Sequence, residues 1–358
     1  MGNGIMYATR EQVTASLEIF NTARAYPIID AKILAASRGI EGRMKRRFYP
    51  EIRTIKADWP NYSLSPTWEF QLGDNELISL SALSSGGVSI PTANAFLSRA
   101  DNRLEPPYNI LQLSLGSSSA FSAGSTFQQA LQITGLTGTN DTDTSLGAAC
   151  ALGGNINGSV NTLVLNPTAG IYTVGVGSIL LIGTERLILT QRRMSDTTIN
   201  TAGTLAAQQS AVSLAVTDGT NFAVGETILV ESERMRIVDI AGNTLTVDRA
   251  WDGSVLAAHA SGLDVYGLRT FTCRRAALGT TAAAHTTADV VYAHDWPPSI
   301  NELCIAESVV LLEQNAGGYA RVIGSGAATR EAKGEGLADI RDTAWNEWGR
   351  NRSRLGAI

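Results

Sequence analysis

A duplicated segment in the middle of the chain constrains the fold more than any other feature. Residues 174–189, VGVGSILLIGTERLIL, align without gaps with residues 222–237, FAVGETILVESERMRI, at a constant offset of 48. Each copy has an apolar run, a turn, and a second run that begins with Glu-Arg, which predicts a β-hairpin. The residues that coincide are Gly177 with Gly225, Glu185 with Glu233, and Arg186 with Arg234.

A second internal repeat follows, at a different offset in the sequence. Residues 249–266, RAWDGSVLAAHASGLDVY, align with residues 275–292, RAALGTTAAAHTTADVVY, at an offset of 26, which places His259 on His285. Each copy predicts a loop of small residues ahead of a strand. Repeated hairpins of this kind bury one face against each other, so we expect a small barrel or sandwich.

The two ends of the chain have helical patterns. Thr9 and Gln12 form a capping-box pattern at the start of a helix expected over about 10–25. A second helix is expected from Ile28, in the stretch 28–50, which ends in a basic flank.

The C-terminal region also has helical patterns. Ser299 and Glu302 form another capping-box pattern, which predicts a helix over about 300–315, and a last helix is expected over 337–348.

The predicted fold class is therefore α+β: a small helical bundle from both chain termini with a large inserted all-β domain of repeated hairpins. The predicted segments are 1–50 (N-terminal helices), 51–115 (a short β region), 116–292 (the inserted β-domain) and 293–358 (C-terminal helices and a basic tail). Strands of the short β region are expected near 52–57, 67–71, 77–83 and 109–115.

Charge is unevenly distributed along the 358 residues. The net charge is −5, but residues 1–60 hold ten Lys or Arg against six Asp or Glu, and residues 61–295 hold 11 against 19. An acidic centre argues against a body that grips duplex DNA. No run reaches the roughly 18 apolar residues of a membrane span, and the start lacks a secretory signal, so we expect synthesis in the cytoplasm.

Candidate catalytic or metal-binding residues are few. The three cysteines, Cys150, Cys273 and Cys304, are widely spaced, which predicts reduced, buried thiols. His259 and His285 hold equivalent repeat positions, which favours a structural role over a zinc site. Glu-Arg neighbours on a strand point to opposite faces, so cross-strand or intersubunit ion pairs are expected instead of joint catalysis. We therefore predict no enzyme activity, no cofactor and no metal.

Two basic segments remain as candidate contact sites. The first is the run of Arg43, Lys45, Arg46 and Arg47, which suits a solvated helix end, a subunit contact or a nucleic-acid contact. The second is the Arg-rich stretch after Trp348, which is either a solvated tail or a segment that orders when it docks into a partner.

The order of weaker motifs resembles a known family. The basic segment ending in RRFYP (46–50), the PPY at 106–108, and PPSINELCIAESVVLLEQ (297–314) followed by an arginine-rich end are similar to the head-to-tail connector, or adaptor, proteins of long-tailed bacteriophages. The repeated hairpins are similar to an embellishment of larger members. The resemblance implies a virion neck protein that forms a ring, typically dodecameric, on the portal protein, extends the DNA channel and offers a platform for the next neck or tail protein.

This resemblance also implies roles for particular residues. Double-stranded DNA would pass through the lumen without sequence-specific binding, and no membrane is involved. The candidate portal-binding residues are Trp348, Arg350, Arg352, Arg354, Leu355 and Ile358. The candidate subunit-interface residues are Arg43, Arg46, Arg47, Glu302 and Glu307.

Three alternatives stay open. A tail terminator or other tail-side neck protein would also form a ring. A surface- or carbohydrate-binding β module would need exposed aromatic side chains, and the repeats offer only Trp251, Tyr266 and Tyr292. A histidine-dependent metalloenzyme would hold a stoichiometric metal.

Overall fold

The protein is mostly β, and the predicted α+β fold built on a helical bundle is wrong. The computed structural model places 37% of the chain in strands, with a largest sheet of ten strands and four helices among the described residues. The predicted large antiparallel β-domain is present. The described residues are 4–17, 26–59, 66–101, 104–147, 150–166, 174–316, 322–323, 330–331 and 335–350.

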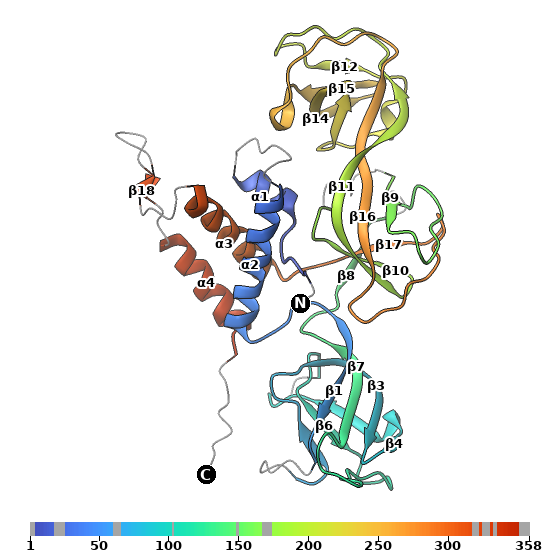
Figure 1. Cartoon of the computed structure of the whole chain (residues 1–358), viewed down its shortest axis with the longest axis vertical. Helices are drawn as coiled ribbons and strands as arrows, with labels where there is room; N and C mark the ends of the chain where they lie inside the picture. Colours follow the sequence, from blue (N-terminus) through green and yellow to red (C-terminus); the bar gives the residue numbers. More distant parts are fainter. Residues whose placement is uncertain are drawn as a thin grey trace. The chain divides into compact units, whose positions relative to one another are not determined.

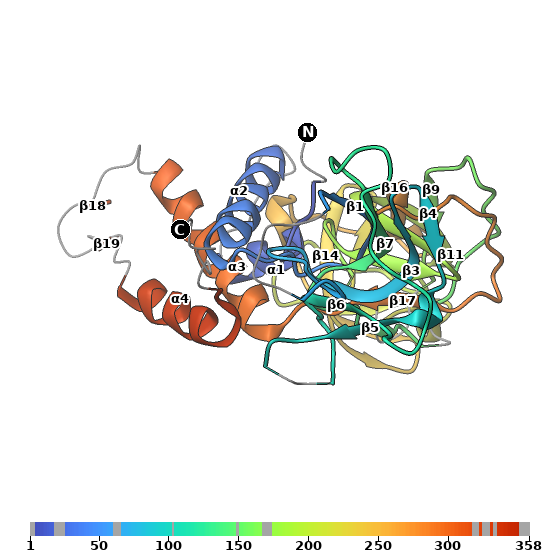
Figure 2. The same ribbon diagram turned by 90° about the horizontal axis from the view of Figure 1, so that it is seen from below.

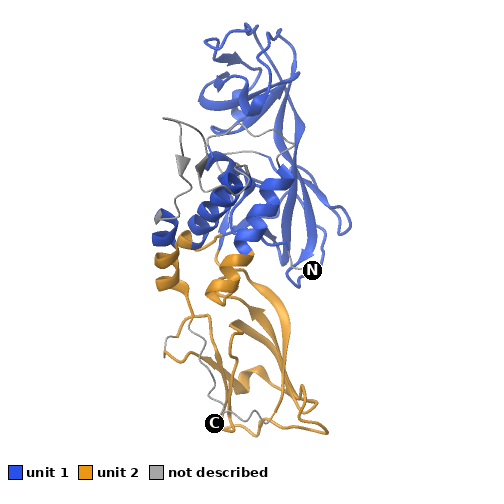
Figure 3. Cartoon of the chain, turned by 60° about the vertical axis from the view of Figure 1, so that its left-hand side comes forward, with its two compact units in different colours: residues 1–37, 143–294, 300–340 blue, residues 38–142, 295–299, 341–358 orange. Residues whose placement is uncertain are grey.

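The chain divides into two compact units, coloured separately in Figure 3. Unit 1 comprises residues 1–37, 143–294 and 300–340, and unit 2 comprises residues 38–142, 295–299 and 341–358. The division at residue 142 lies well after the predicted start of the insertion at residue 116. The reason is that β7 pairs with both β1 and β3 and so joins residues 131–137 to unit 2.

Two antiparallel sheets build unit 2. The first has the order β1-β7-β3-β4 and the second the order β2-β6-β5. Alternate side chains of β7 are buried, as expected for a strand that packs one face on a core. The strands are β1 Glu51–Ala57, β2 Glu69–Gln71, β3 Leu77–Ser85, β4 Val88–Ile90, β5 Ala95–Ser98, β6 Ile110–Leu113 and β7 Leu131–Thr137.

One apolar cluster fills unit 2. It includes Leu77, Leu111 and Leu131, which are fully buried, and the ring of Trp59 lies 4.8 Å from that of Phe121. The four strands expected in this region are present, with ends that differ from the expected ones by two residues or fewer. Local β-patterns therefore located the strands correctly, but they do not predict the pairing of β1 and β3 with β7.

Unit 1 contains the ten-stranded antiparallel sheet. Its order is β12-β15-β14-β13-β16-β11-β10-β17-β8, and β9 pairs with β16 beside this path. The strands are β8 Asp143–Ser145, β9 Thr162–Val164, β10 Ile179–Ile182, β11 Glu185–Asn200, β12 Ser213–Ala215, β13 Thr227–Val230, β14 Glu233–Ala241, β15 Thr244–Asp248, β16 Asp264–Ala277 and β17 Val291–His294.

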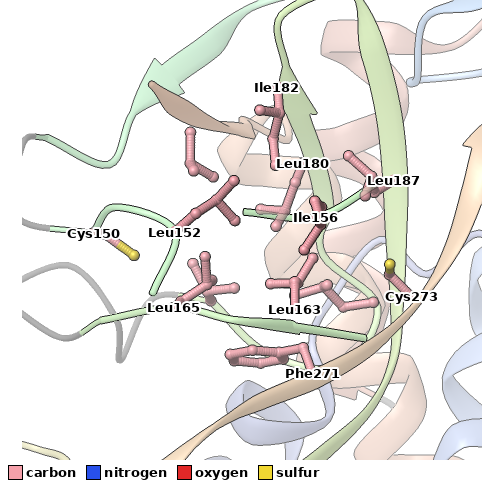
Figure 4. Packing of buried hydrophobic residues seen from close by; sticks show 13 residues of the cluster. Cys150, Leu152, Ile156, Leu163, Leu165, Leu180, Ile182, Leu187, Phe271 and Cys273 are labelled. Carbon is pink, nitrogen blue, oxygen red and sulfur yellow. The ribbon is translucent and has the colours of Figure 1, made fainter. Parts of the chain in front are cut away.

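The repeats fold as two β lobes, and one lobe is inserted into the other. The outer lobe has a core drawn from residues 150–189 and 271–293, shown in Figure 4. The inserted lobe has its own core, drawn from residues 199–265. The long strands β11 and β16 pair along their length and connect the lobes (Figure 1).

This nesting explains the two sequence offsets. The offset of 48 relates hairpin β10-β11 of the outer lobe to hairpin β13-β14 of the inserted lobe. The offset of 26 relates the loop that follows β15 to the loop that follows β16 and completes the outer lobe. Equivalent hydrogen bonds recur in both lobes: the Gly177 amide donates to Leu189 (2.9 Å), and the Gly225 amide to Ile237 (2.8 Å). The predicted repeated hairpins are therefore confirmed.

The four helices expected from the sequence are present, with some differences at their ends. The capping box of Thr9 and Gln12 is confirmed, but α1 covers only Arg10–Ser16, and residues 18–25 lie outside the described residues. Ser299 lies inside α3 instead of capping it, because the helix begins at Pro298. Within unit 1, α2 and α3 lie side by side (Figure 2), with Ser37 Oγ 3.4 Å from Cys304 Sγ. The remaining elements are α2 Tyr26–Met44, α3 Pro298–Ala316, α4 Glu335–Trp348, β18 Val322–Ile323 and β19 Arg330–Glu331.

Replacement of Gly135 by alanine is expected to destabilise unit 2. A Cβ atom at this central position of β7 would lie 2.1 Å from the backbone oxygen of Ser79, so the strand pair must separate. We expect Gly135→Ala to lower the free energy of unfolding by roughly 2 kcal/mol in urea titrations followed by circular dichroism. Gly42→Ala is the control, because α2 has open space there and alanine favours helix. Equal stability of the two variants would contradict this packing.

Candidate functional site

The inserted lobe contains a buried carboxylate with a complete set of donors. Glu233, at the start of β14, is fully buried and accepts two hydrogen bonds from the Arg249 guanidinium, both 2.8 Å long. The amides of Ala250 (2.9 Å) and Ala257 (3.0 Å) donate to the same carboxylate, and His259 Nε2 lies 2.9 Å from it. Five donors thus reach two oxygens.

The outer lobe repeats this arrangement with equivalent residues. Glu185, at the start of β11, is fully buried and accepts hydrogen bonds of 2.8 and 2.7 Å from Arg275. The amides of Ala276 and Ala283 donate at 2.9 Å each, and His285 Nε2 lies 2.9 Å away. We call these two groups the Glu233 cluster and the Glu185 cluster.

Local backbone geometry positions the donors. Ala250 and Ala276 both have positive φ angles, 52° and 49°, which turn their amides towards the carboxylates. Each is the residue directly after the cluster arginine. A left-handed alanine is disfavoured, so the hydrogen bonds from Arg249 and Arg275 and their neighbours must hold these turns.

The arginines also tie the loops together. Arg249 donates to the backbone oxygens of Ala206, Ala211 and Ala257, at 2.6 to 2.9 Å. Arg275 donates in the same way to those of Asn157, Val160 and Ala283. Each cluster therefore joins a hairpin turn to two loops that are distant in sequence.

The arginines next to the cluster glutamates point elsewhere, as the strand geometry predicts. Arg186 pairs with Asp143 through two bonds of 2.9 and 2.8 Å, and Arg234 pairs with Asp252. The predicted cross-strand ion pairs are confirmed for Glu185 with Arg275. His294 Nδ1 also lies 3.3 Å from Asp143.

These environments strongly shift the pKa values of the two glutamates. Burial would raise the pKa of Glu185 and Glu233, but hydrogen bonds from arginine, backbone amides and histidine outweigh it and lower each pKa to about 2. Two carboxylate oxygens offer about four lone-pair positions. With five donors in place, neither carboxylate has a free position to accept a substrate proton. The contacts of each cluster instead hold a hairpin turn and its neighbouring loops together.

The predicted portal-binding residues fall partly within the described residues. Trp348, at the end of α4, packs edge-on against Phe48 at 5.8 Å and donates to Ser299 Oγ at 3.1 Å. Arg350 lies 2.8 Å from the buried carboxylate of Glu76. The others, Arg352, Arg354, Leu355 and Ile358, lie outside the described residues.

The predicted subunit-interface residues are divided between the two units. Arg43 and Arg47 are exposed in unit 2, where Arg47 pairs with Glu51 at 2.7 Å. Arg46 is half-buried and lies 3.5 Å from Glu76. In α3, Glu302 is exposed and Glu307 is buried.

Sequence reasoning missed Arg249 and Arg275 as partners of the repeated glutamates. Both are the first residues of the aligned segments at 249 and 275, so the signal was present in the alignment. His259 and His285, which hold equivalent repeat positions, each place Nε2 2.9 Å from a buried carboxylate.

Other candidate chemistry is limited within the described part of the chain. No group of three or more His, Cys, Asp or Glu side chains there is placed to hold a metal ion. The cysteines are free and buried, as predicted, and burial raises the pKa of each thiol to about 11, which disfavours thiolate reactivity. Trp251, Tyr266 and Tyr292 are half-buried, and the Arg236 guanidinium covers the Trp251 ring at 5.0 Å. Among the described helices, none has both the length and the apolarity needed to cross a membrane.

Comparison with protein-family models, with curated proteins and with solved structures gave no match.

The clusters predict a defined dependence of stability on pH. Glu233 has a folded-state pKa near 2, below its ordinary value of 4.5, so its contribution is complete above pH 4.5 and is lost as the pH falls towards 2. The shift corresponds to about 3 kcal/mol at neutral pH. We expect Glu233→Gln to remove this stability at pH 7 and to reduce by about half the acid dependence that the two clusters supply, since Glu185 has the same pKa; both are measured by urea unfolding.

The control is Asp248→Asn, which changes an exposed carboxylate next to Arg249. It should leave both the stability at pH 7 and the acid dependence close to those of the wild type. If Glu233→Gln retained the wild-type acid dependence, the cluster would not be its source.

Proposed function

We propose that this protein is a structural component of a bacteriophage virion neck that forms a ring on the portal, extends the DNA channel and provides the platform for tail attachment. Support comes from the sequence resemblance to head-to-tail connectors and from one structural observation. That observation is an apolar groove along α3, the helix that carries the candidate subunit-interface residues Glu302 and Glu307.

The groove lies within unit 1 and has a volume of about 520 Å³. Apolar side chains dominate its lining, and the exposed carboxylate of Glu302 and the amide of Asn301 also line it. An apolar centre with a polar rim is the usual anatomy of a protein interface. The lining residues are Ser16, Asn301, Glu302, Ile305, Ala306, Val309, Val310, Leu337 and Ile340.

A groove of this kind suits a head-to-tail contact between copies. If one copy inserts apolar side chains into the groove of the next, the contact is heterologous, and heterologous contacts that close produce rings. The predicted interface residue Glu302 is on this surface, whereas Glu307 is buried on α3.

The repeated clusters support a structural role as well. In unit 1, the Glu233 cluster and the Glu185 cluster each bring together a carboxylate, a histidine and an arginine. Internal hydrogen bonds fill the acceptor positions of both carboxylates. In unit 2, Trp348 and Arg350 are fixed by Phe48 and Glu76. Residues 351–358, with Arg352 and Arg354, therefore follow directly from an anchored point and are the segment we assign to portal docking.

Assembly can be tested by light scattering and sedimentation. The purified protein should behave as a monomer alone and co-sediment at several copies per head with DNA-filled, tailless phage heads. Val309→Glu should remain folded but reduce the copies per head by roughly tenfold or more, because an unpaired carboxylate in an apolar contact is costly. Val255→Glu, at a side chain that is 77% exposed, is the control.

A different pattern would overturn the proposal. If the protein does not bind heads but sediments with tails, it is a tail-side component. If it assembles with neither, it is not a neck ring protein.

Removal of residues 351–358 separates docking from folding. This truncation keeps Trp348 and Arg350, so we expect an unchanged melting temperature and circular dichroism spectrum. Co-sedimentation with heads should be lost, because the segment that carries Arg352 and Arg354 is missing. The control replaces the same eight residues by a Gly-Ser segment of equal length, which should also fail to dock. Undiminished binding of both variants would exclude a docking role for this segment.

A further inference from the structure

Unit 2 contains a cleft lined mainly by cationic side chains. Its volume is about 440 Å³, and its walls come from the end of α2, the segment that follows it, β1, and the turn before β3. The lining residues are Arg38, Glu41, Gly42, Lys45, Arg46, Arg47, Arg53, Asp74, Asn75, Glu76, Thr137 and Gly138. We call this the arginine cleft.

Three arginines of the cleft have buried nitrogens without a hydrogen-bond partner. Among the described residues, five buried side-chain nitrogen or oxygen atoms have none, and three of the five are Arg38 Nη2, Arg46 Nε and Arg53 Nε. All three arginines line this one cleft. A buried donor without an acceptor is unfavourable, so the concentration of three such donors here indicates a missing acceptor.

The acids of the cleft do not supply that acceptor. Glu41 accepts from Arg38 Nη1 at 2.6 Å, which leaves Nη2 unpaired. Glu76 accepts from Arg350 at 2.8 Å and from Thr139 at 3.1 Å, and lies 3.5 Å from Arg46. Asp74, the remaining carboxylate, is exposed.

Charge in the cleft is unbalanced. Five cationic side chains line it against three carboxylates, Glu41, Asp74 and Glu76, which leaves an excess of two positive charges. Burial lowers the pKa of Arg53, and the neighbouring charge of Arg47 lowers it further. Burial also lowers the pKa of Arg46 despite Glu76 beside it. For Arg46 and Arg53, the neighbouring carboxylates therefore do not offset the cost of burying the guanidinium group.

The end of α2 accounts for only part of this arrangement. The C-terminus of a helix favours cations, which explains Lys45, Arg46 and Arg47 directly after α2. It does not explain Arg53, which lies on β1 and donates to Asn75 through Nη2 only. Nor does it explain why three guanidinium groups keep a buried N–H group unpaired.

We propose that the arginine cleft binds a dianionic oxyanion, with a phosphate group as the ligand. Two negative charges match the excess of two positive charges, and a tetrahedral group of oxygens can accept from several guanidinium groups that surround it. Planar guanidinium forks are well matched to phosphate. The phosphate belongs either to a small phosphate ester or to a nucleic-acid backbone. Phosphate binding here is independent of the proposed neck function.

Calorimetric titration of the full chain with inorganic phosphate and pyrophosphate tests this site. We expect saturable binding that remains when ionic strength is matched with sodium chloride. Arg46→Met and Arg53→Met should each weaken binding by about tenfold or more, as expected for the loss of a charge-assisted hydrogen bond. Lys56→Met is the matched control, because Lys56 is exposed on the same strand as Arg53 but does not line the cleft.

Folding is checked by circular dichroism. If an arginine variant unfolds, Lys45→Met replaces it, because Lys45 is an exposed cation of the cleft, and its loss should weaken binding without loss of structure. A short DNA duplex that displaces phosphate would identify the nucleic-acid backbone as the source, and failure to displace would identify a small phosphate ester. Absence of binding above the chloride control, or equal binding by Arg53→Met and Lys56→Met, would overturn the proposal.

Discussion

The β lobes of unit 1 depend on two buried carboxylates. An isolated buried charge is strongly unfavourable, and a buried ion pair is tolerated only when its remaining hydrogen-bonding positions are filled. Glu185 and Glu233 meet this requirement through five donors each, which come from a guanidinium, two backbone amides and an imidazole. Because each set of donors lies on one segment, residues 249–259 for Glu233 and 275–285 for Glu185, each lobe can bury its glutamate only if that segment is folded against it.

Local signals in the sequence were read correctly where a local interaction decides the structure. The capping box of Thr9 and Gln12 forms, and the strands of 51–115 lie close to their expected positions. The fold class failed because it depends on pairing between distant segments. β7 joins unit 2 by pairing with β1 and β3, and neither partner is visible in the β-pattern of residues 131–137.

In the candidate sites, too, local features were predictable from the sequence and contacts between distant segments were not. The repeat singled out Glu185, Glu233 and both histidines by position, because duplication preserves residues that share a contact. The repeat did not show that Arg275 binds Glu185, which is ninety residues earlier in the sequence. The two residues are far apart because the inserted lobe lies between them in the chain. In unit 2 the basic run at 43–47 was evident, but Arg53 joins it only through the path of the chain into β1.

The nested lobe leaves and rejoins its host at adjacent points. Asn200, at the end of β11, is paired with Asp264, at the start of β16, and their side chains share a hydrogen bond of 2.9 Å. The 63 residues between them therefore form a closed excursion from one strand pair. The excursion is also fastened beyond this junction, because β13 pairs with residues 265–267 of β16 and the buried carboxylate of Glu226 accepts from Arg269. A module exchanged at this point would therefore have to supply a strand and an acid for β16 as well as close the chain.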